Sequence, residues 1–502
     1  MKRFFQGETI GFLLIWGFLM AYGSQKLFRD PGTFWHLAVG QHILATHHFM
    51  STDIFSFTFQ GQPWVAHQWL MECLMARLNA AAGLDGLLIL TATSLAMLYT
   101  WLLRRLLNGG LHPLLAALVL GMALAASSHH FHARPHVISI ICFALTYAWL
   151  VDFEARRVDL KGMLWLLPLF LLWSNSHGAV LGGLATFFLA ICGWGAARLL
   201  RQESPLDNWK EAALLAALFL GCALTALVNP YGWELPRTWL AIMRSPAVSG
   251  LIQEHASAFR TGDWTVVMFG VIYLAALAGT KWPRVTWLLP VVWFGLALSR
   301  VRHGPLFAAA ALLALAEMFP EIRWARWLAA RGSVCLGLQP VEPEGRRLTA
   351  TNLLIPALAV ATAILVSQIG LPGGRPPGQR LVRLDPKHWP VELLPELKAY
   401  EKSHPPGTPI FNDFRMGGFL IYYTPGLRVF VDDRCELYGD DFLFPLLEGD
   451  PERIEDWAKR YGFEMALTQA GSNFDRYLRR ARGWRLVREA AAGSLYQRVG
   501  KD

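Results

Sequence analysis

The sequence has few charged residues and few cysteines. Asp, Glu, Lys and Arg make up 17% of the 502 residues, whereas about 25% is usual for a soluble domain. The six cysteines show neither a disulfide framework nor the spacing of a zinc site. The chain has no glycine-rich phosphate loop, no nucleotide-binding fingerprint and no Ser-His-Asp motif order. This balance excludes a disordered chain, a disulfide-stabilised secreted module and an ordinary cytosolic enzyme.

Apolar residues are abundant, at 54%, and many of them form long runs. A membrane-spanning helix needs about 20 mostly apolar residues, and about 17 suffice. The runs predict an α-helical polytopic membrane protein with about 11 transmembrane helices. Their positions are near residues 10–23, 86–106, 113–128, 135–153, 161–174, 178–200, 211–229, 264–280, 284–299, 304–319 and 349–369. The first run lacks a small-residue cleavage site, so we expect a retained helix and not a signal peptide.

The net charge of +9 is spread along the chain. Lys and Arg recur between the apolar runs, which is typical of cytoplasmic loops and does not favour a nucleic-acid partner. The positive-inside rule places the N-terminus in the cytoplasm. An odd number of spans then places the C-terminus outside.

The composition changes after residue 369. We expect a transmembrane domain over residues 1–369, a Pro/Gly linker over residues 370–379 and a soluble α/β domain over residues 380–502 on the outer face. In the last of these, short strands are predicted at 410–411, 419–423 and 428–431, and helices at 451–461 and 473–482.

The outer loop of residues 24–66 is the longest between the predicted spans. Asp30 and Pro31 suit the start of a helix. We expect a surface helix over residues 34–45, a strand over 54–59 and a second surface helix over 67–78. Candidate proton-transfer residues in and beside this loop are Asp30, His36, Asp53, His67 and Glu72. Asp30 also suits a helix cap, and the simpler role for Asp53 is to cap a turn.

Other polar residues cluster on the same predicted side of the membrane. Four histidines accompany Arg134 in residues 127–136. A metal site is conceivable there, but we favour an anion because no carboxylate is close in sequence. The planar donors of Arg suit phosphate, although snorkelling to lipid headgroups is the alternative. The candidate ligands of a substrate or lipid phosphate are Arg134, His177, Arg300, Arg302 and His303, with Glu254 as a further candidate.

The predicted outer domain has a charged group beside an apolar strand, made of Asp432, Asp433, Arg434 and Glu436. Its candidate site residues are Asp432 and Arg434. A structural ion pair at the strand end is the simpler interpretation, and recognition of an acceptor is the alternative. Gly417 and Gly418 would allow a close backbone approach or a tight turn.

Several motifs resemble a family of bacterial polytopic membrane proteins related to the GT-C glycosyltransferases. They begin with Asp30-Pro-Gly-Thr-Phe-Trp-His-Leu, Ser51-Thr-Asp-Ile-Phe-Ser-Phe and Pro63-Trp-Val-Ala-His-Gln-Trp-Leu. They continue through Arg134-Pro135, Asn175-Ser-His-Gly178, Asn229-Pro-Tyr-Gly232, Arg302-His-Gly-Pro305 and Val431-Asp-Asp-Arg434. This chain has Gln68 where the family usually has Glu, which removes one alternative base.

The resemblance implies a GT-C-like helical bundle in the bacterial inner membrane. It implies an enzyme that takes a sugar from a polyprenyl phosphate and transfers it to an extracytoplasmic acceptor, namely an envelope glycan, lipid or protein. Asp30 matches the family's catalytic acidic residue in the first outer loop. Many GT-C enzymes have a second acidic motif in the next outer loop, and this chain has only His and Arg there.

Two other functions stay open at this point. A flippase for a lipid-linked glycan would need polar groups on both sides and repeated halves, which we do not find. A non-catalytic scaffold in envelope polysaccharide assembly would use the outer domain for docking. No cofactor is certain, and a divalent metal is possible but not favoured. The expected contacts are membrane lipids, the lipid-linked sugar and the acceptor.

Overall fold

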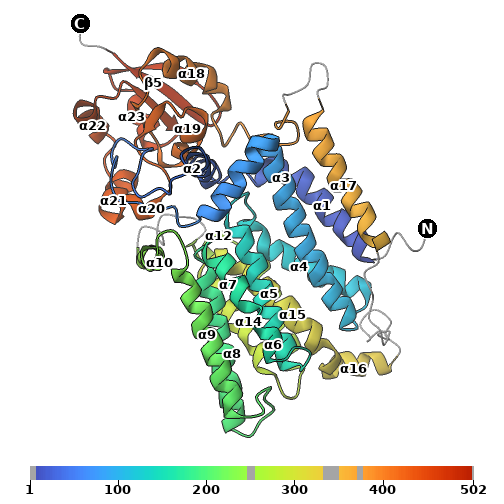
Figure 1. The fold of residues 1–502 in the computed structure, drawn as a ribbon. Helices are drawn as coiled ribbons and strands as arrows, with labels where there is room; N and C mark the ends of the chain where they lie inside the picture. Colours follow the sequence, from blue (N-terminus) through green and yellow to red (C-terminus); the bar gives the residue numbers. More distant parts are fainter. Residues whose placement is uncertain (1–6, 246–254, 332–349, 370–376, 500–502) are drawn as a thin grey trace.

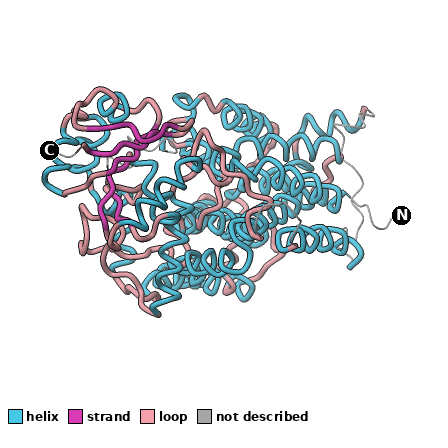
Figure 2. The backbone as a smooth tube through the Cα atoms, turned by 90° about the horizontal axis from the view of Figure 1, so that it is seen from above, coloured by secondary structure: helices cyan, strands magenta, loops and turns pink. Residues whose placement is uncertain are grey.

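The computed structural model describes residues 7–245, 255–331, 350–369 and 377–499. Long helices form a bundle, and the only sheet in the described residues belongs to the C-terminal part of the chain, at one end of that bundle (Figure 1). Seen from above, the strands lie on one side and the helical bundle extends away from them (Figure 2).

All eleven predicted apolar runs coincide with helices. These are α1 (Gly7–Lys26), α3 (Trp69–Asn108), α4 (Pro113–Ser127), α5 (His136–Glu154), the pair α6 (Leu160–Met163) and α7 (Leu166–Ser174), α8 (Val180–Leu199), α9 (Trp209–Leu224), α13 (Trp264–Ala278), α14 (Val285–Ser299), α15 (Gly304–Met318) and α17 (Ala350–Gln368). By length and composition, six helices in the described part of the chain could cross a membrane, and further apolar helices are shorter. The protein is therefore a multi-pass membrane protein, while the number of spans and their orientation stay predictions.

Helix α15 lies at the centre of the bundle. It packs against α3, α4, α5 and α14. Its run of alanines, Ala308–Ala311, is fully buried, because small side chains let neighbouring helices approach closely. At the end of the bundle away from the sheet, Arg105 and Arg157 form ion pairs with Asp152 and Glu317.

The C-terminal sheet has the strand order β2-β1-β3-β5-β4. Strand β1 runs parallel to β2 and β3, whereas β5 runs antiparallel to β3 and β4. The strands are β1 (Thr408–Asn412), β2 (Leu427–Val429), β3 (Met465–Gln469), β4 (Trp484–Glu489) and β5 (Gly493–Arg498). The helices of this part are α18 (Leu394–Ser403), α19 (Gly417–Tyr423), α20 (Cys435–Tyr438), α21 (Asp440–Glu448), α22 (Arg453–Tyr461) and α23 (Asn473–Leu478). The remaining described α-helices are α2 (Gly32–Thr46), α10 (Glu234–Arg244), α12 (Ala258–Thr261) and α16 (Arg323–Ala330).

Two of the predicted strands are wrong. Residues 419–423 belong to helix α19, whose short apolar run packs against α2. A run of this length fits a strand or a buried helix equally well. Residues 54–59 form only an isolated bridge, Ser56 to Val429. The Asp53 carboxylate accepts hydrogen bonds from the amides of Phe55 and Ser56, which bends the chain before a strand can form.

The predicted helix over residues 34–45 is confirmed as α2, but it does not lie exposed on a surface. Its Phe34, Leu37 and Val39 side chains are fully buried. Helix α3 packs on one part of it and α19 on another. A helix that is apolar around most of its circumference is usually buried. The predicted helix over 67–78 begins at Trp69 and continues, through non-helical Ala82 and Gly83, as α3.

The segment after the predicted linker packs on the helical bundle. Asp85 in α3 accepts hydrogen bonds from the backbone amides of residues 380–382. Trp389 Nε1 donates to the Phe28 carbonyl at 2.7 Å, and Arg29 forms an ion pair with Asp385. Most of the predicted linker lies outside the described residues. The division at residues 369 and 380 therefore stays a prediction, but the two parts are joined by these hydrogen bonds and this ion pair.

Candidate active site

Asp30 lies in the turn between α1 and α2, at the end of the bundle that faces the C-terminal domain. Arg134 Nη1 lies 2.8 Å from its Oδ1 and 2.9 Å from its Oδ2. The Gly32 amide also donates to Oδ1, at 2.8 Å. A Cβ at Gly32 would lie 2.7 Å from Arg134 Cζ, so glycine is needed for this approach. The turn thus places a carboxylate and a guanidinium together, with Asp30 also shaping the start of α2.

Asp433 belongs to the segment between β2 and α20. Burial raises its pKa well above the ordinary range, and the negative charge of Asp30 raises it further, while Arg134 lowers it. Its Oδ1 atom is buried without a hydrogen-bond partner among the described residues. Asp433 belongs to the charged group expected here, but it is not among the site residues that the sequence predicts.

His177 follows α7 and is held by a short hydrogen-bond chain. Trp173 Nε1 donates to Ser139 Oγ at 2.8 Å, and Ser139 Oγ lies 3.0 Å from His177 Nδ1. The Ala179 amide also donates to Nδ1, at 3.1 Å. Nδ1 is therefore the acceptor, and the hydrogen of neutral His177 is on Nε2. Burial and then the charge of Arg302 lower the pKa of His177, so this neutral donor is its expected form.

His36 and Glu72 form a buried pair behind the Asp30 turn. His36 Nδ1 lies 2.7 Å from Glu72 Oε1, and neither side chain is more than 1% exposed. Burial, and then the charge of Arg134, lower the pKa of His36. His67 lies close by, with Nε2 2.8 Å from Gln68 Nε2 and Nδ1 4.0 Å from Glu436. Burial lowers the pKa of His67 as well. Both imidazoles are therefore expected to be neutral.

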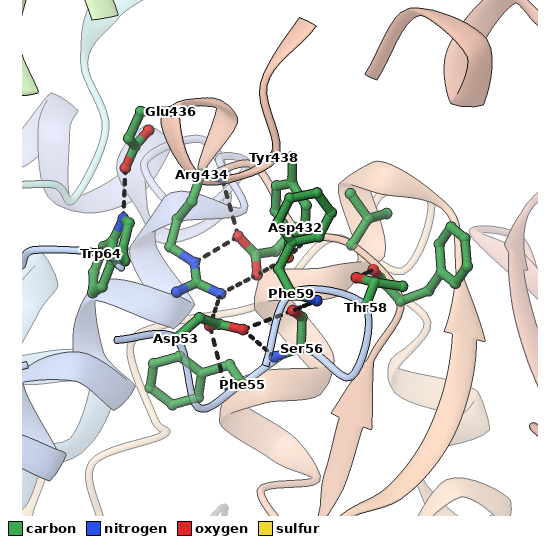
Figure 3. A network of polar contacts seen from close by, with 12 residues as sticks. Asp53, Phe55, Ser56, Thr58, Phe59, Trp64, Asp432, Arg434, Glu436 and Tyr438 are labelled. Atoms are coloured by element: carbon green, nitrogen blue, oxygen red, sulfur yellow. Dashed lines mark hydrogen bonds and ion pairs between the residues drawn. The ribbon is translucent and has the colours of Figure 1, made fainter. Parts of the chain in front are cut away.

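Asp53, Asp432 and Arg434 form a separate buried network (Figure 3). Arg434 Nη2 lies 2.7 Å from each carboxylate, and all three side chains are fully buried. The guanidinium also lies 4.8 Å from the ring centre of Trp64. Asp53 additionally accepts from the Ser56 hydroxyl, and Asp432 accepts from the Tyr438 hydroxyl. This arrangement joins the outer loop to the C-terminal domain.

The remaining candidates predicted from the sequence, Arg300, Arg302 and His303, lie between helices α14 and α15. Arg302 contacts His255, and Arg302 and His303 form a 3₁₀ turn, η4 (Val301–His303), after Arg300. The His303 ring lies 5.8 Å from the ring of Trp293. Glu254 lies outside the described residues.

Histidines 130, 132, 136 and 177 lie near one another, with His130 and His136 ring centres 4.1 Å apart. His136 Nε2 also donates a hydrogen bond to the His130 carbonyl oxygen, at 2.7 Å. Within the described ranges, no group of three or more His, Cys, Asp or Glu side chains is arranged to hold a metal ion.

Comparisons with solved structures show that the chain as a whole shares a known fold. The oligosaccharyltransferase of Archaeoglobus fulgidus in its apo form aligns with a TM-score of 0.53 and 10% identity, covering 92% of this chain and 69% of that one. Its structure tethered to an acceptor peptide aligns with a TM-score of 0.51 and 10% identity, covering 93% of this chain and 70% of that one. ArnT from Cupriavidus metallidurans bound to undecaprenyl phosphate aligns with a TM-score of 0.48 and 12% identity, over 98% of both chains.

No protein-family model and no curated protein sequence matches the chain. The fold class is nevertheless defined: this is a polytopic membrane protein with a helical bundle and a small C-terminal sheet domain. More particularly, the helical bundle has a GT-C-like fold. At this identity the likeness shows the fold alone.

Proposed function

We propose that this protein is a membrane glycosyltransferase that uses a polyprenyl-phosphate-linked sugar and an extracytoplasmic acceptor. The observation that carries the proposal is the Asp30–Arg134 pair, in the turn that Gly418 of the C-terminal domain approaches at Pro31. A carboxylate for proton transfer and cations for a phosphate are the groups that such a reaction needs. The GT-C fold supports the reaction class.

In the proposed reaction, a hydroxyl of the acceptor attacks the anomeric carbon of the donor. The new carbon–oxygen bond forms as the bond between that carbon and the phosphate oxygen breaks, and the electron pair leaves with the phosphate. The acceptor proton moves to a carboxylate of the Asp30 centre. Preorganised cations and donors stabilise the negative charge that develops on the phosphate.

Arg134, His177 and Arg302 are the proposed phosphate-binding residues. Burial has the largest effect in lowering the pKa of His177, and the positive charges of Arg302 and Arg134 lower it further, which supports a shared site. Neutral His177 offers an Nε2 hydrogen, while each guanidinium offers charge and planar donors. Arg300 and His303, the sequence neighbours of Arg302, are further candidates, Arg300 as a cation and His303 as a neutral donor. Together these groups favour an anionic lipid headgroup over a neutral one.

Mass spectrometry of co-purifying lipids tests the proposal. Wild type, Asp30→Asn and Arg302→Ala are purified in parallel, with Arg482→Ala as a matched control because Arg482 is exposed in the C-terminal domain. We expect a polyprenyl-phosphate sugar in wild type, Asp30→Asn and the control, and its loss from Arg302→Ala. Absence of every polyprenyl species from all four samples would overturn the proposed donor class.

A further inference from the structure

The C-terminal domain brings a second carboxylate to the Asp30 centre. The start of α19 lies against the Asp30–Pro31 turn: a Cβ at Gly418 would lie 2.3 Å from the Pro31 carbonyl oxygen. The preceding residue, Gly417, approaches the segment after β2 closely too, since a Cβ there would lie 2.1 Å from the Val431 carbonyl oxygen and 2.7 Å from Asp432 Cβ. Two adjacent glycines thus connect the Asp30 turn to the segment that carries Asp433.

Asp433 differs from its neighbours in that segment. Asp432 and Arg434 are fully buried and bound to each other, so both are committed to the structural network. Asp433 Oδ1 is also buried, but it has no hydrogen-bond partner in the described parts of the chain. A buried carboxylate oxygen without a donor is costly, because burial removes its water. An unused oxygen of this kind is suited to receive a proton from a substrate.

Asp30 itself has less capacity to receive one. Both of its oxygens already contact Arg134, and Oδ1 also accepts from the Gly32 amide. These three contacts use most of the roughly four lone-pair sites of a carboxylate. The neighbouring Asp433 Oδ1 has no hydrogen-bond donor among the described residues and offers more capacity to an acceptor hydroxyl.

The charges around Asp433 favour proton uptake. Burial has the largest effect, Asp30 and Asp432 add negative charge, and Arg134 opposes them. Together they raise the pKa of Asp433 well above its usual value. A raised carboxyl pKa brings a general base closer to the working pH, where it is most effective. Asp30, held in place by Arg134, would supply the nearby negative charge.

We propose that Asp433 is a catalytic residue that, paired with Asp30, receives the proton of the acceptor hydroxyl. The proposal rests on the proposed glycosyl transfer and adds the proton acceptor to it. The hydroxyl oxygen forms the new bond to the anomeric carbon, and its proton is transferred to Asp433 Oδ1. The leaving phosphate keeps the electron pair of the broken bond. The C-terminal domain is then part of the catalytic centre and not only a docking module.

Infrared difference spectroscopy tests the carboxylate pair without any substrate. Full-length wild type, Asp433→Asn and Asp30→Asn are titrated in lipid nanodiscs, with Asp441→Asn as the control because Asp441 is exposed in the same domain. The wild-type-minus-Asp433→Asn spectrum should contain a protonated carboxyl band that persists above the ordinary Asp range. In Asp30→Asn, this band should titrate at lower pH, because a negative charge is removed and Arg134 is released. A spectrum of Asp433→Asn identical to that of wild type would overturn the inference.

Turnover tests the catalytic role. The lipid fraction that co-purifies with wild type is added back to each variant as donor, together with a cell-envelope extract as the source of acceptor hydroxyls. Release of free polyprenyl phosphate is followed by mass spectrometry across pH. We expect Asp433→Asn to retain lipid and thermal stability but to lose about 10²- to 10⁴-fold in rate. The Asp441→Asn control should keep the wild-type rate and pH profile.

The two proposals fail in different ways. If wild type transfers sugar and Asp433→Asn matches its rate and pH profile, only the role of Asp433 is wrong. A rate loss in Asp433→Asn accompanied by lost lipid and lowered melting temperature would assign a structural role and also overturn it. If wild type neither retains a polyprenyl lipid nor releases polyprenyl phosphate, the glycosyltransferase proposal itself fails.

Discussion

Arg434, in the C-terminal domain, forms a fully buried ion pair of 2.7 Å with Asp53, in the loop between α2 and α3. The same guanidinium binds Asp432 at the same distance. One side of this network therefore belongs to the outer loop and the other to the sheet domain. Because Asp433 lies between Asp432 and Arg434 in sequence, the network also sets where that carboxylate can lie.

Replacing Arg434 should therefore be strongly destabilising. Arg434→Met keeps much of the side-chain volume but leaves Asp53 and Asp432 as two buried carboxylates without their cation. Breaking a buried ion pair from one side typically costs about 3–5 kcal/mol. We expect a lower melting temperature in detergent, measured by intrinsic tryptophan fluorescence. Arg482→Met, at an exposed position of the same domain, should melt like wild type. Equal melting of Arg434→Met and wild type would contradict a stabilising network.

The contact between α19 and the Asp30 turn predicts a different phenotype. In Gly418→Ala, the new Cβ would overlap the Pro31 carbonyl oxygen, at 2.3 Å. The domain must shift away from the turn, at a cost of about 1–3 kcal/mol for overpacking. We expect sugar transfer to fall further than stability does, because Asp433 moves with α19.

Gly483→Ala is the matched control for this substitution. The nearest atom to a Cβ at Gly483 is Glu455 Oε2, at 4.0 Å, which is ordinary contact. Transfer rate and melting temperature are measured on both variants. A Gly418→Ala protein with unchanged transfer would show that this close approach does not matter for the site.

The helical bundle could be predicted well from the sequence, because a run of apolar residues reports directly on a spanning helix. Every run from 10–23 to 349–369 coincides with a helix. Short segments were harder to assign. Residues 419–423 read as a strand because the helical period needs more residues than that to be recognised.

The site depends on contacts that no local pattern reports. Asp30 and Arg134 were both selected, but their pairing joins two loops that are far apart in sequence. Asp433 is not among the predicted site residues, because the sequence does not show which of the two adjacent aspartates Arg434 binds. The Gly417-Gly418 pair was the available clue, since it indicated a close backbone approach. Only the fold shows that the surface approached is the Asp30 turn.

The raised pKa of buried Asp413 leads us to expect that the stability of the C-terminal domain depends on pH. Burial raises its pKa from 3.8 to about 6, although Ser472 and the Gln469 amide donate to its Oδ2. The folded state thus binds this proton more tightly than the unfolded state does. The contribution is fully present below about pH 4 and is lost as pH rises through about 6. A tenfold difference in proton affinity between the two states corresponds to about 1.4 kcal/mol, so the loss is at most about 3 kcal/mol.

Melting temperature measured from pH 4 to 8 checks this expectation. Asp413→Asn should remove part of the wild-type fall in stability between about pH 4 and 6. Asp456→Asn is the control, because the Asp456 side chain is 82% exposed. Parallel wild-type and Asp413→Asn curves would contradict the raised pKa of Asp413.

Asp85 in α3 binds the segment that leads into the C-terminal domain, so we expect it to hold that domain on the bundle. Its Oδ2 accepts from the Arg380 amide at 2.8 Å, and its Oδ1 accepts from the Leu381 and Val382 amides at 3.0 and 2.8 Å. The Asp85 residue is fully buried, so water cannot replace these amides as donors to its carboxylate. In Asp85→Asn, one acceptor oxygen becomes an NH₂ group that faces a backbone donor. Hydrogen bonds to a charged group contribute about 1.5–3 kcal/mol, and we expect a destabilisation of that size.

In Asp85→Asn, the segment of residues 380–382 should detach from α3 at a lower temperature than the one at which the whole protein unfolds. Trypsin should cleave Asp85→Asn after Arg380 or Arg383 at temperatures where wild type stays intact, because the backbone at 380–382 must detach before it can enter a protease. Glu203→Gln, at an exposed position in the α8–α9 loop, controls for a changed carboxylate. Detachment would also loosen the ion pair of Asp385 with Arg29, next to Asp30. We therefore expect sugar transfer to decline at the temperature where cleavage begins. Cleavage and transfer that match wild type at every temperature would show that the Asp85 anchor is not needed to hold the domain at the site.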